Sequence, residues 1–152
     1  MDPGGGNNRQ KLAAIAFAAD RPRIEELNQL VHPAVVAEQD RWSEQIGRED
    51  PAGIAMVEAA LIFEAGLRSH FDRIVAVVCH PERKIERLAS RLGIGLPAAR
   101  AEVERRSRAQ WPDAEKAWLA DLVIHNDGSL EETAQQVDRA FAELKQQAMC
   151  HR

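Results

Sequence analysis

Two short apolar runs, residues 54–60 and 74–79, constrain what this chain can fold into more than any other feature. Each run is rich in aliphatic residues and does not alternate between polar and apolar positions. A parallel strand covered by helices on both faces has this pattern, because neither face can present polar groups to water. Residues 121–125 form a third short run. Since the intervening segments have helical composition, we predict an α/β fold with functional groups near the strand ends.

Length and composition are those of one ordinary globular domain. The chain has 152 residues, of which 45% are hydrophobic and 29% charged, and we expect a single core. No apolar run approaches the roughly 20 residues that span a bilayer, so no membrane partner is expected. The first 12 residues lack the basic-then-apolar order of a secretory signal, and the chain has two cysteines, Cys79 and Cys150. A reducing, cytoplasmic location is therefore predicted.

The charge is unevenly distributed along the chain. The net charge of −4 argues against general nucleic-acid binding. One segment is nevertheless rich in basic residues, which suggests a partner that carries phosphate groups. These residues are Arg83, Lys84, Arg87, Arg91, Arg100, Arg105, Arg106, Arg108 and Lys116.

Helices are predicted before the first apolar run. Residues 9–19 have helical composition, and Pro22 suits the first turn of a second helix. His32 and Pro33 are expected to interrupt that helix, with Pro33 starting a third one. Residues 47–53, rich in turn-forming residues, are predicted to form a loop.

Four further helices are predicted after the second apolar run. Ser129 and Glu132 have the spacing of a capping box, which places the start of the last helix beside the turn Asn126-Asp127-Gly128. The predicted helices are residues 81–92, 97–110, 113–119 and 130–144.

Five separated motifs together resemble the dephospho-coenzyme A kinase family. They agree with it in order and spacing from about Arg9 to Leu144, and a set of five is far more specific than any one of them. The motifs are His32-Pro33, ALIFEAGL at 60–67, FDRIVAVVC with PERKIERLASRLG at 71–93, RAQ at 108–110, and K..LADLVIHNDGSLEE at 116–132.

The resemblance implies a fold and an activity. It implies a three-layer P-loop kinase-like fold with a parallel sheet, in which residues 54–80 and 120–146 form the core. Residues 9–46 would be a helical acceptor-binding region and residues 81–119 a helical lid, all within one partial kinase domain, 1–152. The family transfers the γ-phosphoryl group of ATP, with Mg²⁺, to the ribose 3′-hydroxyl of dephospho-CoA, which is the final step of coenzyme A biosynthesis.

One family feature is absent from these 152 residues. Members begin with a strand and a phosphate-binding loop, GxxxxGK[ST], followed by a strand that ends in an aspartate pair. Gly4, Gly5 and Gly6 have neither a preceding strand pattern nor a following Gly-Lys-Ser/Thr. Because that loop supplies most of the charge neutralisation in phosphoryl transfer, we expect transfer by this chain alone to be impaired. A noncatalytic nucleotide- or CoA-binding remnant is the alternative, and a kinase for another small nucleoside or nucleotide acceptor is a more distant one.

On the ATP side, the resemblance implies two groups of residues. Arg87 and Arg91 are four residues apart, on one face of a helix, and would reach phosphates as lid arginines. Asn126, Asp127 and Gly128 would form the loop that packs against adenine. The structural alternatives are a solvated helix face for the arginines and a simple turn for the loop.

On the acceptor side, the resemblance implies seven residues that contact dephospho-CoA. Four of them also have a structural alternative: a cap or core residue for His32, a structural carboxylate for Glu64, and a lid contact for Arg108 and Gln110. These residues are Arg9, Leu12, His32, Phe63, Glu64, Arg108 and Gln110. No catalytic residue is assigned, because the loop lysine and the aspartate base are not in the sequence. No metal ligand is assigned either, because Cys79 and His80 have no second Cys/His pair at zinc spacing.

Overall fold

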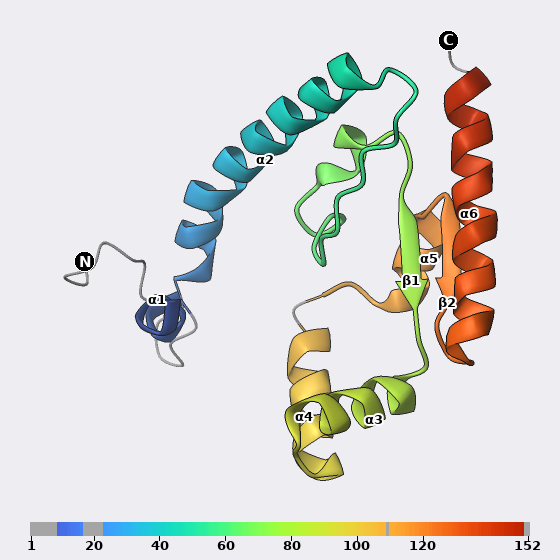
Figure 1. Ribbon diagram of the computed structural model, residues 1–152. Coiled ribbons are helices and arrows are strands. Elements are labelled where there is room, and N and C mark those ends of the chain that lie inside the picture. Colours follow the sequence, from blue (N-terminus) through green and yellow to red (C-terminus); the bar gives the residue numbers. More distant parts are fainter. Residues whose placement is uncertain (1–8, 17–22, 109, 151–152) are drawn as a thin grey trace. The chain divides into compact units, whose positions relative to one another are not determined.

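The computed structural model describes residues 9–16, 23–108 and 110–150, which form two compact units, 1–55 and 56–152 (Figure 1). In the described part of the chain, no helix is both long and apolar enough to cross a membrane.

The first unit contains two helices, α1 (Arg9–Ala16) and α2 (Ile24–Glu49). The predicted interruption at His32 and Pro33 is wrong, because α2 continues through Pro33. Proline removes one backbone N–H from the helix ladder, and the many backbone bonds on either side keep a helix of 26 residues intact. The predicted helix end at 19 and restart at Pro22 lie outside the described residues.

The end of α2 is set by a local turn. The N–H of Asp50 still donates to the carbonyl of Ile46, and the N–H groups of Ala52 and Gly53 then donate to the side chain and carbonyl of Asp50. An aspartate that bonds its own following backbone in this way favours a turn over further helix. The predicted loop at 47–53 therefore begins about three residues later than expected, after Glu49.

The second unit contains a two-stranded parallel sheet of β1 (Val75–Val78) and β2 (Leu122–His125). Val75 pairs with Leu122 and Val78 with His125, so both strands end on the same edge. The predicted parallel sheet of short apolar strands is confirmed for these two runs. Ile74 and Ile124 are buried beside this ladder.

The first predicted strand, residues 54–60, is wrong. These residues have no regular structure, and residues 62–66 form turns that lead into a short 3-10 helix, η1 (Leu67–His70). An extended segment becomes a strand only when a neighbour pairs with its N–H and C=O groups. Among the described residues, no strand lies beside this run, and the side chain of Met56 within it is exposed, as is that of the following Leu61.

Three helices connect β1 to β2: α3 (Pro81–Leu92), α4 (Leu96–Ser107) and α5 (Asp113–Leu119). The predicted helices here are confirmed to within three residues at each end. Gly93 ends α3 with a φ of 65°, a left-handed conformation that suits glycine. The α3–α4 hairpin then closes over a small core of Ile85, Leu88, Ala89 and Ala99, and α5 packs against β1 (Figure 1).

The last helix, α6 (Leu130–Cys150), packs along β2 (Figure 1). Its predicted capping box is confirmed: the N–H of Ser129 donates to Glu132 Oε2 at 2.7 Å, and the N–H of Glu132 donates to Ser129 Oγ at 3.1 Å. One turn later, the Gln136 amide bonds both the N–H and the carbonyl of His125, at 2.9 and 2.8 Å. These bonds fix the start of α6 against the end of β2.

Asp121 holds the opposite end of the two strands together. Its Oδ2 accepts from the backbone N–H of Ile74 at 2.7 Å and from Arg68 Nη2 at 2.9 Å, while its own N–H donates to the Ile74 carbonyl. Arg68 also donates to the carbonyl of Phe71. The beginnings of both strands and the end of η1 therefore meet at one carboxylate.

Candidate functional site

The carboxyl ends of β1 and β2 bring two sequence-distant segments together. The N–H of Asn126 donates to the Val78 carbonyl at 2.8 Å, and the N–H of His80 donates to Asp127 Oδ1. Such strand ends are where α/β proteins place ligands, because the backbone leaves the sheet there and the following loops converge. The predicted functional edge is therefore formed by residues 78–80 and 125–128.

The Asp127 carboxylate already has a hydrogen-bond partner at this edge of the sheet. The His80 N–H donates to its carboxylate and, with help from the Cys79 thiol, holds its pKa below the usual value despite the opposing effect of burial. Asn126 is also fixed, because its side-chain oxygen accepts from the Thr133 hydroxyl at 3.2 Å. The turn therefore has a structural role, whatever it binds.

Gly128 has a steric role in the same turn. Its φ is not in the left-handed range, so backbone strain does not explain the glycine. A Cβ at this position would instead collide with the Glu132 carboxylate that caps α6. The absence of a side chain therefore allows the capping box to close directly behind the strand end.

Arg87 lies at the same edge as Asp127. Its guanidinium is 3.8 Å from Cys79 Sγ, and Cys79 also adjoins Asp127. Burial raises the pKa of the Cys79 thiol, and the positive charge of Arg87 only partly opposes that effect. The thiol therefore stays protonated at neutral pH and acts as a neutral neighbour of the arginine.

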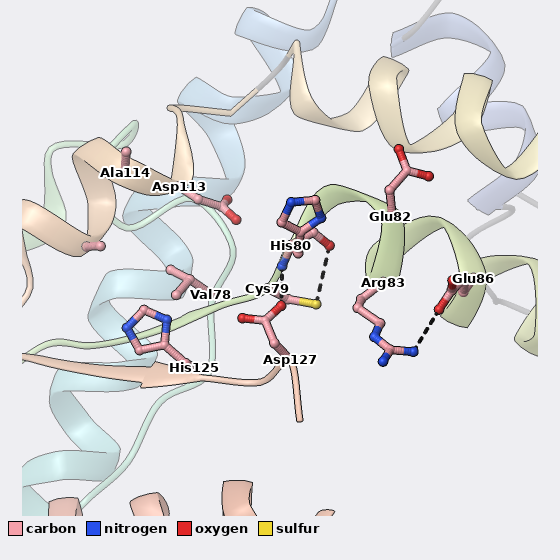
Figure 2. A pocket seen from close by; sticks show the side chains of 11 residues that line it. Val78, Cys79, His80, Glu82, Arg83, Glu86, Asp113, Ala114, His125 and Asp127 are labelled. Atoms are coloured by element: carbon pink, nitrogen blue, oxygen red, sulfur yellow. Dashed lines mark hydrogen bonds and ion pairs between the residues drawn. The ribbon is translucent and has the colours of Figure 1, made fainter. Parts of the chain in front are cut away.

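An open hollow of about 680 Å³ adjoins these strand ends (Figure 2). Four carboxylates and Arg83 line it, and each carboxylate has a partner: Glu82 bonds Arg100, Glu86 bonds Arg83, Asp113 bonds Lys84, and Asp127 bonds the His80 backbone. Figure 2 shows Arg83 turned toward Glu86 and Asp127 lying beside Cys79 and His80. Neither Arg87 nor Arg91 lines this hollow, and the one arginine that does, Arg83, is paired with Glu86, so the described lining offers no unpaired arginine or lysine to a phosphate.

The basic segment divides into paired and unpaired cations. In α4, Glu102 bonds both Arg105 and Arg106, which lowers the pKa of that carboxyl to about 2. Within described residues 81–119, all but three of the basic side chains form an ion pair with a carboxylate. The paired ones are Arg83, Lys84, Arg100, Arg105, Arg106 and Lys116; the three others are Arg87, Arg91 and Arg108.

Three of the predicted acceptor-side residues meet in a second cluster, around Glu64. The ring of Phe63 stacks on the ring of Trp111 with a centroid separation of 6.2 Å. Glu64 Oε1 accepts a hydrogen bond from the backbone N–H of Trp111 at 2.7 Å. Lys116 Nζ is 2.8 Å from the same oxygen and also reaches the side chain of Gln110. Phe63, Glu64 and Gln110 are therefore brought together.

Sequence reasoning did not place Trp111 and Lys116, which complete that cluster, among the acceptor-side residues. Lys116 stands in the motif at 116–132, but its partner is 52 residues earlier in the chain. The two charged side chains are each only 14% exposed. A half-buried ion pair of this kind depends on how distant segments pack and has no local sequence signal.

The other predicted acceptor-side residues are placed elsewhere. Arg108 directly follows α4 and is exposed. Leu12 is exposed in α1, and His32 lies half-buried in α2, both in the first unit. The side chain of Arg9 lies outside the described residues.

Comparison with known proteins agrees with the motif series. The family model described as dephospho-CoA kinase matches residues 1–132. The dephospho-CoA kinase of Geobacillus kaustophilus (strain HTA426) is 36% identical over 146 residues, which is 96% of this chain and 68% of that protein. The chain belongs to the dephospho-CoA kinase family.

Other members of the family match over a similar extent. The dephospho-CoA kinase of Chlorobium chlorochromatii (strain CaD3) is 33% identical across 95% of this chain and 66% of its own length. That of Synechococcus elongatus is 39% identical across 90% of this chain and 62% of its own length. This chain thus spans about two thirds of the length of the dephospho-CoA kinases that it matches.

A solved structure also supports the fold. The crystal structure of TT1252 from Thermus thermophilus is similar with a TM-score of 0.67 and 30% identity, covering 93% of this chain and 69% of that one. The α/β class predicted from the apolar runs, and the family predicted from the motifs, are therefore both confirmed.

Proposed function

We propose that this chain acts in the ATP-dependent phosphorylation of the ribose 3′-hydroxyl of dephospho-CoA, the final step of coenzyme A biosynthesis. Family membership supports the reaction class. The observation that carries the proposal is the set of unpaired cations, because the three basic side chains without a carboxylate partner in described residues 81–119 include both predicted lid arginines. Unpaired guanidinium groups are the ones available for bidentate bonds to phosphate.

In this proposal, residues 81–119 act as the lid. The strand ends at 78–80 and 125–128 serve ATP, and the cluster around Glu64 serves dephospho-CoA. Arg87 and Arg91 bind the ATP phosphates, and the turn Asn126-Asp127-Gly128 borders the adenine. Both arginines are exposed, and Arg87 adjoins the strand end that carries Asp127 through their common neighbour Cys79. The residues proposed for the ATP phosphates and those proposed for the adenine therefore all belong to the second unit.

Acceptor residues are proposed in each unit separately. Phe63, Glu64, Arg108 and Gln110 belong to the second unit, and Arg9, Leu12 and His32 to residues 9–46 of the first. Glu64 and the phosphates of dephospho-CoA are both anionic, so the carboxylate serves the hydroxyl-bearing part of the ligand and Arg108 serves its phosphates.

The described residues show no magnesium site formed by protein side chains alone. Within the described ranges, no group of three His, Cys, Asp or Glu side chains is arranged to hold a metal ion. Asp127 at the strand end is bonded to the His80 backbone. No step of the reaction is therefore derived through Mg²⁺ here, although the family uses it with ATP.

Binding and transfer are measured separately, because these 152 residues contain no GxxxxGK[ST] segment. We expect calorimetric titration to detect binding of ATP and of dephospho-CoA. Replacing Arg87 and Arg91 together by glutamine should weaken ATP binding by about tenfold or more, since each charge-assisted bond to phosphate contributes ~1.5–3 kcal/mol.

Arg83→Gln is the matched control for those two substitutions. It removes the same charge from the same helix, but its guanidinium is already paired with Glu86 at 3.0 Å. We expect ATP affinity to stay within about twofold of the original, because an exposed ion pair contributes little. Equal losses of ATP affinity in Arg83→Gln and in the double variant would contradict the proposal.

Transfer is measured by mass analysis of dephospho-CoA after incubation with ATP and Mg²⁺. Addition of one phosphate at the ribose 3′ position supports the kinase assignment for this chain. Binding of both ligands with no phosphorylated product would instead support the noncatalytic alternative.

A further inference from the structure

Lys116 is the centre of a half-buried polar cluster in the second unit. Its ammonium lies 2.8 Å from Glu64 Oε1, 3.2 Å from the carbonyl of Ala60 and 3.3 Å from Gln110 Oε1. An ammonium group has three N–H donors and no acceptor. All three donors therefore have a partner, which leaves Lys116 without a donor for a phosphate.

The cluster ties two segments that are distant in the sequence. Ala60 and Glu64 belong to the irregular segment before η1, whereas Gln110 lies in the connection between α4 and α5 and Lys116 lies within α5. The Phe63–Trp111 stack and the bond from the Trp111 N–H to Glu64 join the same two segments. The acceptor-side segment is therefore held against the base of the α3–α4 hairpin by one lysine and one aromatic pair.

The two oxygens of Glu64 differ sharply. Oε1 accepts from both Lys116 and Trp111, whereas Oε2 is buried and has no hydrogen-bond partner among the described residues. A buried polar atom without a partner is uncommon in folded proteins and calls for an explanation. Here one carboxylate oxygen is saturated, and the other is enclosed without a hydrogen-bond partner among the described residues.

We propose that Lys116 is a positioning residue, which fixes Glu64 so that Oε2 is kept for a neutral hydroxyl or N–H donor of the bound acceptor. The proposal rests on the proposed function, since it gives Glu64 an acceptor to meet. A phosphate is excluded as the partner of Oε2 by its like charge. Lys116 acts through Glu64 and through the base of the hairpin, and it does not touch the transferred group.

The test compares Lys116→Met, Lys116→Arg and the exposed control Lys145→Met in the full chain. Two measurements are made on each: the affinities for dephospho-CoA and for ATP by calorimetry, and the exchange rate of the Trp111 amide hydrogen by NMR. Lys116→Met should weaken dephospho-CoA binding by about tenfold or more, with ATP affinity unchanged within about twofold. Lys116→Arg should recover most of the lost affinity, and Lys145→Met should match the original protein.

The Trp111 amide reports the positioning role without any ligand. Its N–H donates to Glu64, so losing the lysine should release the carboxylate and speed exchange by about tenfold or more. Unchanged exchange together with unchanged dephospho-CoA affinity in Lys116→Met would overturn the proposal. An equal loss of ATP and dephospho-CoA affinity would overturn it as well, because a general loss of structure predicts that result.

A double variant keeps the proposal testable if Lys116→Met alone does not fold. Glu64→Gln combined with Lys116→Met removes both charges and leaves no uncompensated buried ion. It should stay folded and still bind dephospho-CoA weakly; normal binding would count against the proposal. If the original protein binds no dephospho-CoA, the proposed function fails, and the Trp111 exchange then decides the positioning role alone, with faster exchange in Lys116→Met supporting it and unchanged exchange refuting it.

Discussion

Replacing Asp121 by alanine should destabilise the second unit far more than replacing it by asparagine. Asp121 Oδ2 accepts two hydrogen bonds, from the Ile74 N–H at 2.7 Å and from Arg68 at 2.9 Å. The two substitutions separate these bonds, because the asparagine side chain keeps an oxygen for the backbone N–H and loses only the charge.

The magnitude follows from the surroundings of each donor. Ile74 is 4% exposed, so alanine at 121 strands a buried N–H, which costs ~1–3 kcal/mol. The Arg68 side chain is 41% exposed, and screening by water limits the ion pair to ~0–1 kcal/mol. We therefore expect a loss of about 2–3 kcal/mol for alanine and below about 1 kcal/mol for asparagine.

Amide exchange at Asn126 is the direct assay, because its N–H keeps its bond to the Val78 carbonyl in every variant and therefore reports opening of the second unit. A loss of about 2 kcal/mol corresponds to exchange about 30-fold faster, and urea unfolding should shift in the same order. Arg68→Met is the control, and it should resemble the asparagine variant. Asparagine and alanine variants of equal stability would refute the reasoning, because the ion pair would then outweigh the backbone bond.

Three further predictions concern other parts of the chain. Burial opposes ionisation of Glu64, but the bonds from Lys116 and the backbone N–H of Trp111 lower its pKa below the ordinary 4.5. The free energy of unfolding should therefore fall as the pH drops below about 4.5 toward the pKa of the folded state. Urea unfolding measured over a pH series should lose this dependence in Glu64→Gln. Gly128→Ala should displace the Glu132 carboxylate from the start of α6 and destabilise by ~0.5–1.5 kcal/mol, as seen by thermal unfolding; an unchanged melting temperature would contradict the steric role. Pro33→Ala should restore a helical N–H within α2 and raise helicity by circular dichroism, whereas a loss of helicity would mean that the proline is required there.

The sequence patterns correctly predicted the two strands that pair with one another, because both are apolar runs that the sequence itself shows. Residues 75–78 and 122–125 are apolar on both faces and pair with one another, so periodicity and pairing agree. Residues 54–60 have a similar composition, but no strand pairs with them among the described residues. Apolar composition favours an extended segment, and only a hydrogen-bonding neighbour makes it a strand.

The error at Pro33 has a different cause. Proline was interpreted as a helix start, which is its commonest helical position. The cost of an internal proline is local, however, and the helical bonds before and after it are retained in α2. A rule about one residue therefore underestimated the cooperativity of a long helix.

The candidate site was predictable only in part, and mainly through the motif series. Arg87 and Arg91 could be placed on one helical face from their spacing, and their lack of carboxylate partners within the described segment 81–119 emerged only from the structure. Glu64 was recognised, but its bonds to Trp111 and Lys116 span 47 and 52 positions. Contacts of that range depend on the packing of whole elements, which no local pattern encodes.

Gln136 gives the small sheet a boundary at one rim. Its side-chain amide occupies both backbone groups of His125 that point away from β1, as a residue on a neighbouring strand would. Another chain that sought to extend the sheet along β2 would have to displace this amide first, whereas open strand edges invite uncontrolled pairing. Gln136 on α6 therefore hinders pairing of another strand with the end of β2. Extension of the sheet is left to the β1 side.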